Sequence, residues 1–212
     1  MDYYIFDLDG TLTDSSEGII NSIFYALDEL KITKPSKETA KTFIGPPLLK
    51  TFEALIPASV KPEDAVKKYR EYYATKGIYE NKLYDGVLEM LDKLKREDKK
   101  IALGTAKPTY FAREILQHFN IYDAFDVVVG SHLSGGRTDK KEIIYEVKDQ
   151  WGWQKNDLVT MVGDRSTDIL GGQHFNLPTI GVTYGYGTVE ELNNCKPTYL
   201  VNSVNEITNL IK

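Results

Sequence analysis

The sequence has a single cysteine, Cys195, and only three histidines. One cysteine excludes an internal disulfide framework and a zinc site built from cysteines. The histidines, which are His118, His132 and His174, lack the short spacing of metal ligands. We therefore expect each histidine to be a surface or packing residue.

Long tracts of one residue class are also absent from the sequence. There is no long run of lysine and arginine, and the formal net charge is −5, so a surface that binds nucleic acid is not expected. Because this charge disfavours anionic ligands at long range, a phosphate site would need cations of its own. The chain has no apolar span of membrane length and no signal-peptide pattern at its beginning, which favours a cytoplasmic protein without membrane contact.

Apolar runs alternate with helical patterns along most of the 212 residues, which is typical of a parallel α/β sheet. The runs are rich in Ile, Val and Leu without clean alternation, as in strands that are covered on both faces. The expected strands are 2–8, 100–104, 126–129, 158–162, 178–182 and 198–201. Helix ends are predicted from an N-cap at Asp85, a first-turn proline at Pro108, and capping boxes of Thr188 with Glu191 and Ser203 with Glu206.

The segment from Ser15 to about Leu83 breaks this alternation. It shows only helical patterns, and no strand is expected in it. An all-helical block between the first and second strands of a parallel sheet indicates an inserted domain. We therefore predict a catalytic α/β core of residues 1–14 and 85–212, with a helical domain of residues 15–84 inserted in it.

Two acids follow the first expected strand, in the run Asp7-Leu8-Asp9-Gly10-Thr11. Since side chains alternate along a strand, Asp7 and Asp9 are expected to point the same way. Two carboxylates held together repel each other unless a cation or a shared proton separates them. Gly10 allows the backbone to turn sharply. Taken alone, the run is equally consistent with an ordinary Asp-Gly turn.

The other strand ends deliver side chains of complementary chemistry, and ligand sites of open α/β sheets lie beyond these ends. Thr105 and Ala106 follow the second strand, at an expected helix start where the helix dipole would favour an anion. Lys140 lies beyond the third strand, and Asp164 and Asp168 lie beyond the fourth. Each residue alone has an ordinary interpretation, as a helix cap or a solvated lysine. Their succession, however, is that of a phosphoryl-transfer site.

These segments resemble the four ordered motifs of haloacid dehalogenase-like hydrolases. The matching segments are Asp7–Ser15, Gly104–Lys107, Lys140 and Gly163–Asp168. The resemblance extends along the chain to the phosphoglycolate phosphatase-like branch, which carries a helical cap. Ile44-Gly45-Pro46-Pro47 resembles the cap loop of that branch, and Tyr84-Asp85-Gly86-Val87 resembles its return from cap to core.

The third motif departs from the Gly-Lys-Pro that is commoner in these relatives. It reads Arg137-Thr138-Asp139-Lys140-Lys141, so Lys140 is preferred as the matching lysine and Lys141 stays an alternative. Lys107 follows Thr105 and is interpreted as a solvated lysine, although it is close enough in sequence to reach the phosphate.

The resemblance implies a Rossmann-like core and a two-step hydrolysis of a phosphate ester. Asp7 would attack phosphorus and form an aspartyl-phosphate. Asp9 would protonate the leaving alkoxide and then activate water, and the nearby Asp7 favours the protonated form that this requires. Mg²⁺ would be held by Asp7, by the backbone carbonyl of Asp9 and by Asp164, while Asp168 would act through water or orient Lys140. The residues implied to bind the phosphate are Thr105, Ala106, Gly10 and Lys140, and those implied to set specificity in the cap are Ile44, Gly45, Pro46 and Lys50.

The substrate that the resemblance implies is a small phosphorylated metabolite. Phosphoglycolate is the default, and a 5′-nucleotidase or a pyrophosphatase of the same superfamily is the alternative. Asp9 argues against a dehalogenase, and the lack of histidine between Ser15 and Leu83 argues against a sugar-phosphate mutase. The helical insertion argues against a phosphoacceptor signalling domain, and the complete set of motif residues argues against a catalytically silent binding protein. A monomer and a homodimer both stay open.

Overall fold

The chain divides into two units in the computed structural model, which describes residues 2–154 and 157–211. One unit, called the core unit here, consists of Met1–Asp14 and Leu83–Lys212. The other, the inserted unit, is Ser15–Lys82. The chain leaves the core unit after the short strand β2 (Thr13–Asp14) and returns through β3 (Lys82–Leu83), which pairs with β2. The prediction of no strand between Ser15 and about Leu83 is therefore wrong at β3.

The core unit is built on a six-stranded sheet with the order β5-β4-β1-β6-β7-β8. Every strand pairs in parallel with its neighbours, which confirms the predicted α/β fold with a parallel sheet. β1 lies between β4 and β6, with Phe6 paired to Leu103 on one side and to Val162 on the other. The bounds are β1 Asp2–Phe6, β4 Lys100–Pro108, β5 Val127–Ser131, β6 Leu158–Gly163, β7 Thr179–Val182 and β8 Tyr199–Val201.

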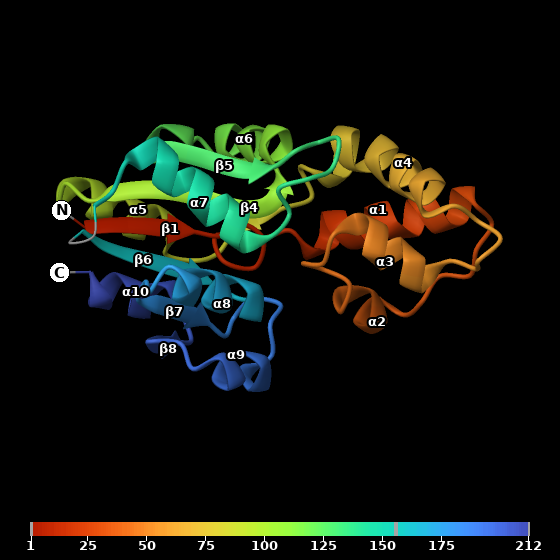
Figure 1. The fold of residues 1–212 in the computed structure, drawn as a ribbon. Helices are drawn as coiled ribbons and strands as arrows, with labels where there is room; N and C mark the ends of the chain where they lie inside the picture. The colour runs from red at the N-terminus through yellow and green to blue at the C-terminus, as the bar shows by residue number, and fades with distance from the viewer. Residues whose placement is uncertain (1, 155–156, 212) are drawn as a thin grey trace. The chain divides into compact units, whose positions relative to one another are not determined.

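Helices cover both faces of this sheet (Figure 1). α7 and α8 pack against each other on one face, and α5 and α10 pack against each other on the other. Under α7, a buried cluster joins Ile143 and Val147 to Ile5 and Met161 of the central strands. Burial of such side chains supplies the main stabilisation, about 2 kcal/mol for each large one. The bounds are α5 Val87–Arg96, α6 Thr109–His118, α7 Lys140–Trp151, α8 Ser166–His174, α9 Val189–Cys195 and α10 Val204–Leu210, with a 3₁₀ turn at Tyr122–Ala124.

The predicted helix caps are correct in part. The side chain of Thr188 accepts a hydrogen bond from the Glu191 N–H, and Ser203 does the same for Glu206. The glutamates do not complete the boxes, because the Glu191 carboxylate binds Arg165 and Ser166 and the Glu206 carboxylate accepts a hydrogen bond from the Asn202 N–H instead.

The N-cap predicted at Asp85 is wrong. α5 begins after Gly86, whose positive φ of 89° places it at the cap position, and no side chain among the described residues caps this helix.

The inserted unit is helical, with α1 Ser16–Glu29, α2 Lys37–Lys41, α3 Leu48–Leu55, α4 Pro62–Tyr72 and a π-helical turn at Tyr73–Gly77. α1 packs along α4 and the π turn. Gly18 makes this approach possible, because a Cβ atom there would lie 1.8 Å from the carbonyl oxygen of Gly77. The apolar side chains Ile19, Ile20, Ile23 and Leu27 of α1 are buried.

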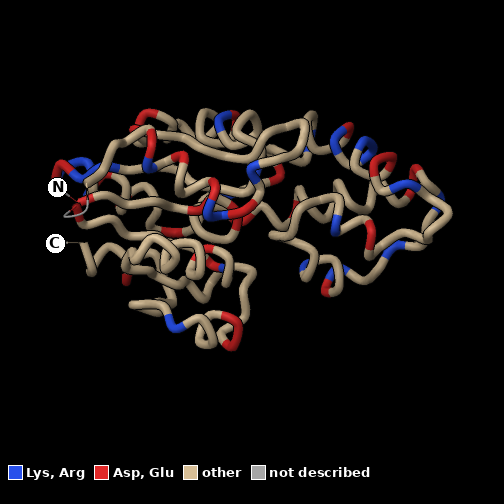
Figure 2. Tube along the Cα trace, in the orientation of Figure 1, with Lys and Arg blue, Asp and Glu red and all other residues tan. Residues whose placement is uncertain are grey.

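Charged residues of both signs are interspersed along both units (Figure 2). Over the described ranges, we find no helix with the length and apolar character that a membrane crossing requires.

Candidate active site

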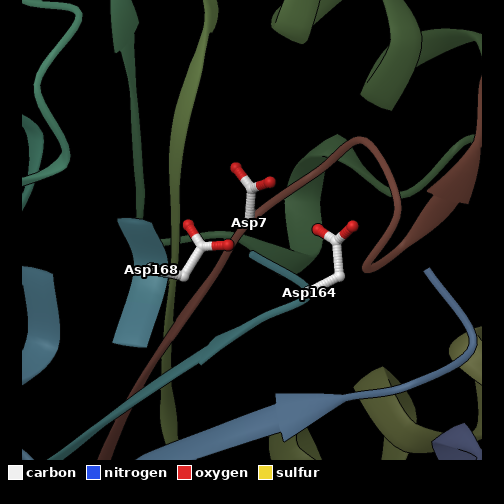
Figure 3. Close-up of side chains that lie close together, drawn as sticks. All are labelled: Asp7, Asp164 and Asp168. Atoms are coloured by element: carbon white, nitrogen blue, oxygen red, sulfur yellow. The ribbon is translucent and has the colours of Figure 1, made fainter. Parts of the chain in front are cut away.

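Three carboxylates meet where the central strands end (Figure 3). Asp7 directly follows β1, Asp164 directly follows β6, and Asp168 lies in the first turn of α8. One carboxylate oxygen from each lies within 4.8 Å of the others. The parallel register explains the meeting, because neighbouring parallel strands end at the same edge of a sheet. The acids predicted at these strand ends thus lie together.

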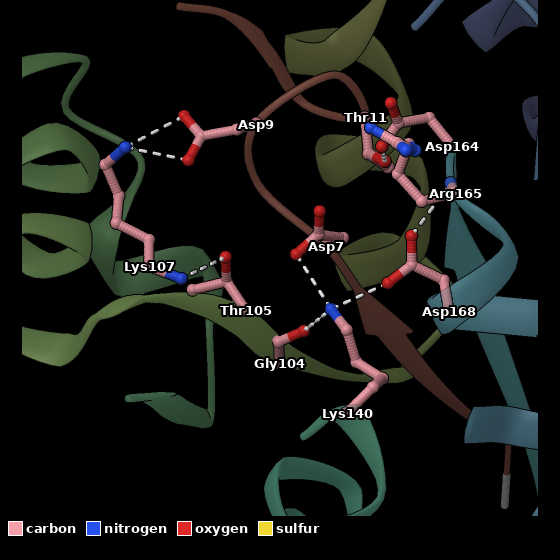
Figure 4. A network of polar contacts seen from close by, with 10 residues as sticks. All are labelled: Asp7, Asp9, Thr11, Gly104, Thr105, Lys107, Lys140, Asp164, Arg165 and Asp168. Carbon is pink, nitrogen blue, oxygen red and sulfur yellow. Dashed lines mark hydrogen bonds and ion pairs between the residues drawn. The ribbon is translucent and has the colours of Figure 1, made fainter. Parts of the chain in front are cut away.

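Lys140 joins two of these acids (Figure 4). Its Nζ atom lies 2.9 Å from Asp7 Oδ1 and 2.7 Å from Asp168 Oδ1, and it donates to the Gly104 carbonyl at 2.7 Å. Lys140 is the first residue of α7 and only 5% exposed. Lys141 is exposed, and its N–H donates to the Asp139 cap. Of the two candidate lysines, Lys140 is therefore the one beside the acids.

Two glycines lie close against the Asp164 side chain. Its carboxylate accepts hydrogen bonds from Thr11 Oγ1 at 3.3 Å and from the Tyr186 N–H at 2.7 Å. Gly10 has a φ of +88°, and a Cβ atom there would lie 2.3 Å from Asp164 Oδ2. A Cβ atom on Gly185 would lie 2.6 Å from the same oxygen. Glycines therefore form the cradle that fixes this carboxylate.

Gly10→Ala should test this cradle against simple backbone strain. Gly135 is the matched control, since its φ is also positive, at 94°, but a Cβ atom there meets nothing within 4 Å. We expect Gly135→Ala to lower the free energy of unfolding by about 1 kcal/mol, the ordinary cost of an alanine at positive φ. Gly10→Ala should cost about 3 kcal/mol or more, because it adds a clash with a buried carboxylate. Equal losses in urea unfolding of the two variants would show that the cradle is unimportant.

Burial and crowding shift the titration of the acids. Burial raises the pKa of Asp7 to about 6; Lys140 opposes this rise and Asp168 adds to it. The pKa of Asp164 is raised well above its ordinary value by burial and then by the charges of Asp168 and Asp7. Burial lowers the pKa of Lys140, but its ion pairs with Asp168 and Asp7 outweigh burial and raise it. The cluster thus carries more negative charge than one lysine offsets, and its oxygen donors suit a hard divalent cation such as Mg²⁺.

Asp168 has both carboxylate oxygens engaged within the protein. Oδ2 accepts a hydrogen bond from the Arg165 N–H at 3.0 Å, and Oδ1 lies against Lys140. A Cβ atom on Gly163 would lie 2.3 Å from this carboxylate, so glycine there provides the room that Asp168 occupies. The ion pair places Asp168 where it can orient Lys140.

The strand before Thr105 is longer than predicted. β4 continues to Pro108 and α6 begins at Thr109, so the expected helix start at Thr105 and Ala106 is wrong. The pairing of β4 with β5 shifts register between Gly104 and Pro108, and this irregular stretch carries Thr105 through Lys107. The argument from a helix dipole therefore does not apply to Ala106. Thr105 is 2% exposed, and its Oγ1 accepts a hydrogen bond from the Lys107 N–H at 3.2 Å.

Lys107 is not the solvated lysine that the sequence suggested. Its Nζ contacts both carboxylate oxygens of Asp9, at 3.0 and 2.7 Å, and its side chain is only 6% exposed. Figure 4 shows Asp9 turned toward Lys107 while Asp7 faces Lys140. The expectation that the two acids point the same way is wrong, because β1 ends at Phe6 and strand alternation does not extend to Asp9.

The loop after β7 contains site residues that the sequence reasoning missed. Tyr184 donates its hydroxyl proton to the Thr11 carbonyl at 2.9 Å, and Tyr186 donates to Asp14 at 3.2 Å. Together with the Tyr186 N–H on Asp164, these bonds tie the loop to the segment that carries Asp7 and Asp9. The position of the loop in the sequence could have indicated these residues, because the loop also follows a parallel strand and so lies at the same edge of the sheet.

The residues predicted to set specificity belong to the inserted unit. Ile44 is buried, Gly45 has a φ of 111°, and Pro46 and Lys50 are exposed. Their role toward a substrate stays a prediction. His118, His132 and His174 are all exposed.

Comparison with known proteins identifies the class of molecule that this arrangement belongs to. The profile of the family described as haloacid dehalogenase-like hydrolase matches residues 4–182. The chain therefore belongs to the haloacid dehalogenase-like hydrolase family, as its motifs predicted. The prediction of a phosphoric monoester hydrolase is likewise confirmed by the family and its phosphatase members.

The relatives of this chain are named after different activities. A protein from Pseudomonas aeruginosa named 5′-nucleotidase is 40% identical over 196 residues, which cover 92% of this chain and 88% of that protein. The tyrosine-protein kinase PtkA of Mycobacterium tuberculosis is 34% identical over 94% of this chain and 68% of its own length. A crystal structure from Clostridium acetobutylicum, described as a predicted phosphatase, superimposes with a TM-score of 0.91 at 40% identity and covers 99% of this chain and 97% of that one. Proteins named pyrophosphatase and phosphoglycolate phosphatase are similar at 30% and 26% identity.

Proposed function

We propose that this protein is a Mg²⁺-dependent phosphatase that hydrolyses a small phosphomonoester through an aspartyl-phosphate on Asp7. The observation that carries the proposal is the buried Asp7 carboxylate, held by Lys140 beside Asp164 and Asp168. A carboxylate in such a position is an oriented nucleophile, and the nearby ammonium offsets the charge that a phosphoryl group brings.

In the first step, an Asp7 oxygen forms a bond to phosphorus as the bond from phosphorus to the ester oxygen breaks. Asp9 gives its proton to the leaving alkoxide. In the second step, Asp9 accepts a proton from the water that attacks phosphorus, and the Asp7 carboxylate is released with inorganic phosphate. Lys140 and the buried Thr105 hydroxyl bind phosphoryl oxygens, while Asp168 holds Lys140 in position.

Asp7, Asp164 and the Asp9 backbone carbonyl are the proposed ligands of Mg²⁺. Three observations support this fit. All of the proposed ligand atoms are oxygens, and carboxylate oxygens of Asp7, Asp164 and Asp168 lie within 4.8 Å of one another. The pKa values of Asp7 and Asp164 are also raised, as is typical of carboxylates crowded together. When bound, the ion would offset the charge of these carboxylates and of the phosphoryl oxygens.

The first substrates to examine are nucleoside 5′-monophosphates, because the relative named 5′-nucleotidase is 40% identical and matches nearly the whole chain. Phosphoglycolate comes next, since the protein of that name is only 26% identical. The inserted unit is proposed to act as a cap that covers a small substrate, with Gly45, Pro46 and Lys50 among the residues that select it. The proposed location is the cytoplasm, and both a monomer and a homodimer are compatible with the proposal.

A rate screen with saturating Mg²⁺ tests this proposal. We expect turnover of p-nitrophenyl phosphate and higher kcat/KM for one class among nucleoside 5′-monophosphates, phosphoglycolate and pyrophosphate. Because one relative is named a tyrosine-protein kinase, the screen should include ATP with a tyrosine-containing peptide. Phosphoryl transfer to the peptide without release of phosphate from any ester would contradict the proposal.

Mg²⁺ should stabilise the folded protein, and more so at neutral than at acid pH. Since the pKa of Asp7 is about 6 rather than 3.8, the metal-free folded state binds this proton more tightly than the unfolded chain does. Metal-free stability should therefore rise as the pH falls from 7 through 6 toward 4. Mg²⁺ at about 100 times its Kd should add about 2.7 kcal/mol at pH 7.5 and less at pH 5, where protons compete with it.

Thermal unfolding with and without Mg²⁺ checks this expectation. Asp164→Asn should remove most of the stabilisation by Mg²⁺. Asp157→Asn is the control, because Asp157 lies at the opposite end of β6, where it accepts a hydrogen bond from the Gln154 N–H. If the Mg²⁺-induced shift were the same in both variants, the proposed ligand set would be incorrect.

A further inference from the structure

Two lysines contact three of the four acids of the site (Figure 4). Lys140 contacts Asp7 and Asp168, whereas Lys107 contacts Asp9. Arg165, the next cation, is paired with Glu191 at 3.0 Å. In the described part of the core unit, Lys140 and Lys107 are the lysines that contact these acids, so a phosphoryl group would compete with carboxylates for both ammonium groups.

The pairing of Lys107 with Asp9 conflicts with the role proposed for Asp9. A carboxylate that accepts contacts on both of its oxygens from one ammonium is fixed in direction. In the proposed reaction, however, Asp9 must turn to the ester oxygen and give it a proton. The Lys107–Asp9 pair must therefore separate before the leaving group can be protonated.

The position of Lys107 supplies the means of separation. Its side chain is only 6% exposed, so breaking the ion pair with Asp9 would leave a buried ammonium without that carboxylate, which costs free energy. Its N–H binds Oγ1 of Thr105, the hydroxyl proposed to hold a phosphoryl oxygen. A phosphate that reaches Thr105 thus arrives beside the Lys107 backbone, from which the long side chain extends to Asp9. A phosphate dianion then competes with the Asp9 carboxylate for the lysine ammonium.

We propose that Lys107 is a positioning residue that exchanges Asp9 for the phosphoryl group of the substrate. In the ligand-free protein, Lys107 holds Asp9 aside. When the phosphoryl group arrives, Lys107 transfers its contact to a phosphoryl oxygen, and Asp9 is released toward the leaving group. The arrival of substrate thereby frees Asp9 to turn toward the ester oxygen. This inference rests on the proposed function, because it takes the roles of Asp9 and Thr105 from it.

Equilibrium binding of inorganic phosphate, measured by calorimetry at saturating Mg²⁺, tests this exchange without any turnover. Lys107→Met should raise the Kd for phosphate about tenfold or more, the worth of one charge-assisted contact, and Lys107→Arg should restore most of the affinity. Lys107→Gln is the second neutral variant, in case methionine impairs folding. Lys100→Met is the control: Lys100 lies at the other end of β4 and pairs with Asp126 at 3.0 Å.

A double-mutant cycle with Asp9→Asn tests whether Asp9 and phosphate compete for Lys107 or whether the two residues affect phosphate binding independently. In the otherwise natural protein, Asp9→Asn removes the competitor for Lys107 and should tighten phosphate binding several-fold. In the Lys107→Met background, the same change should alter the Kd much less. Equal effects of Asp9→Asn in both backgrounds would overturn the proposal, as would a Lys107→Met variant that binds phosphate as tightly as Lys100→Met. Since the readout is binding, this failure is distinguishable from failure of the proposed function, which would appear as absent turnover.

Discussion

Asp7→Asn is expected to lower kcat by at least about 10,000-fold, because it removes the nucleophile and leaves only binding and electrostatic assistance. The variant should still fold, since Asp168 and the Gly104 carbonyl continue to hold Lys140. Substrate binding should change far less than kcat. The measurement is steady-state kinetics with p-nitrophenyl phosphate at saturating Mg²⁺, together with a thermal unfolding curve of each protein.

Asp2→Asn is the matched control for this variant. Asp2 lies at the opposite end of β1, where it pairs with Lys99 at 2.6 Å. Its replacement should leave kcat within about twofold, since surface changes away from the site usually alter little. A loss of kcat below about tenfold in Asp7→Asn, with the fold intact, would remove Asp7 from the role of nucleophile.

Lys140→Met is expected to be the second most damaging change, and it should reduce both activity and stability. The loss leaves Asp7 and Asp168 buried without their shared cation, which should cost about 3–5 kcal/mol of unfolding free energy in the metal-free protein. The rate should fall about 1,000-fold, because one electrostatic contact to the transferring group and the orientation of Asp7 are both lost. Mg²⁺ should recover part of the stability, as it offsets the same carboxylates, but not the rate.

Lys141→Met provides the comparison, because Lys141 is adjacent in sequence and exposed. We expect wild-type kinetics and stability from it. Kinetic loss in Lys141→Met with a normal Lys140→Met variant would reverse the assignment of the lysine. Urea unfolding and kcat/KM of the two variants, measured side by side, decide the question.

The sequence was sufficient for the parts of the site that depend on strand ends. Asp7 and Asp164 follow buried apolar runs, and parallel strands place such ends together whatever the details of packing. The helices between residues 15 and 82 were also predictable, because the period of the hydrophobic pattern changes there, and the role of this segment as a cap stays a prediction. Lys140 was preferred from its match to the third motif, with Lys141 as the alternative, and only the structure shows that Lys141 is exposed.

Features that depend on local register were not predictable from the sequence. The extension of β4 to Pro108 follows from its pairing with β5, which no local pattern in Thr105–Lys107 announces. The direction of Asp9 depends on where β1 stops and on a lysine 98 positions later in the chain. The helix N-cap predicted at Asp85 is wrong because Gly86 is the N-cap residue of α5. Gly86 has a left-handed conformation there, which residue preferences for helix ends do not predict.

Trapping of the phosphorylated enzyme tests the central claim most directly. During turnover with Mg²⁺ and a good phosphomonoester substrate, rapid quenching followed by borohydride reduction converts an acyl phosphate to the corresponding alcohol. Peptide mass spectrometry should then find homoserine in place of Asp7, and the modification should be absent without substrate. Continued release of phosphate with an unmodified Asp7, or with the modification at Asp9 instead, would contradict the assignment of Asp7 as the residue that carries the phosphoryl group.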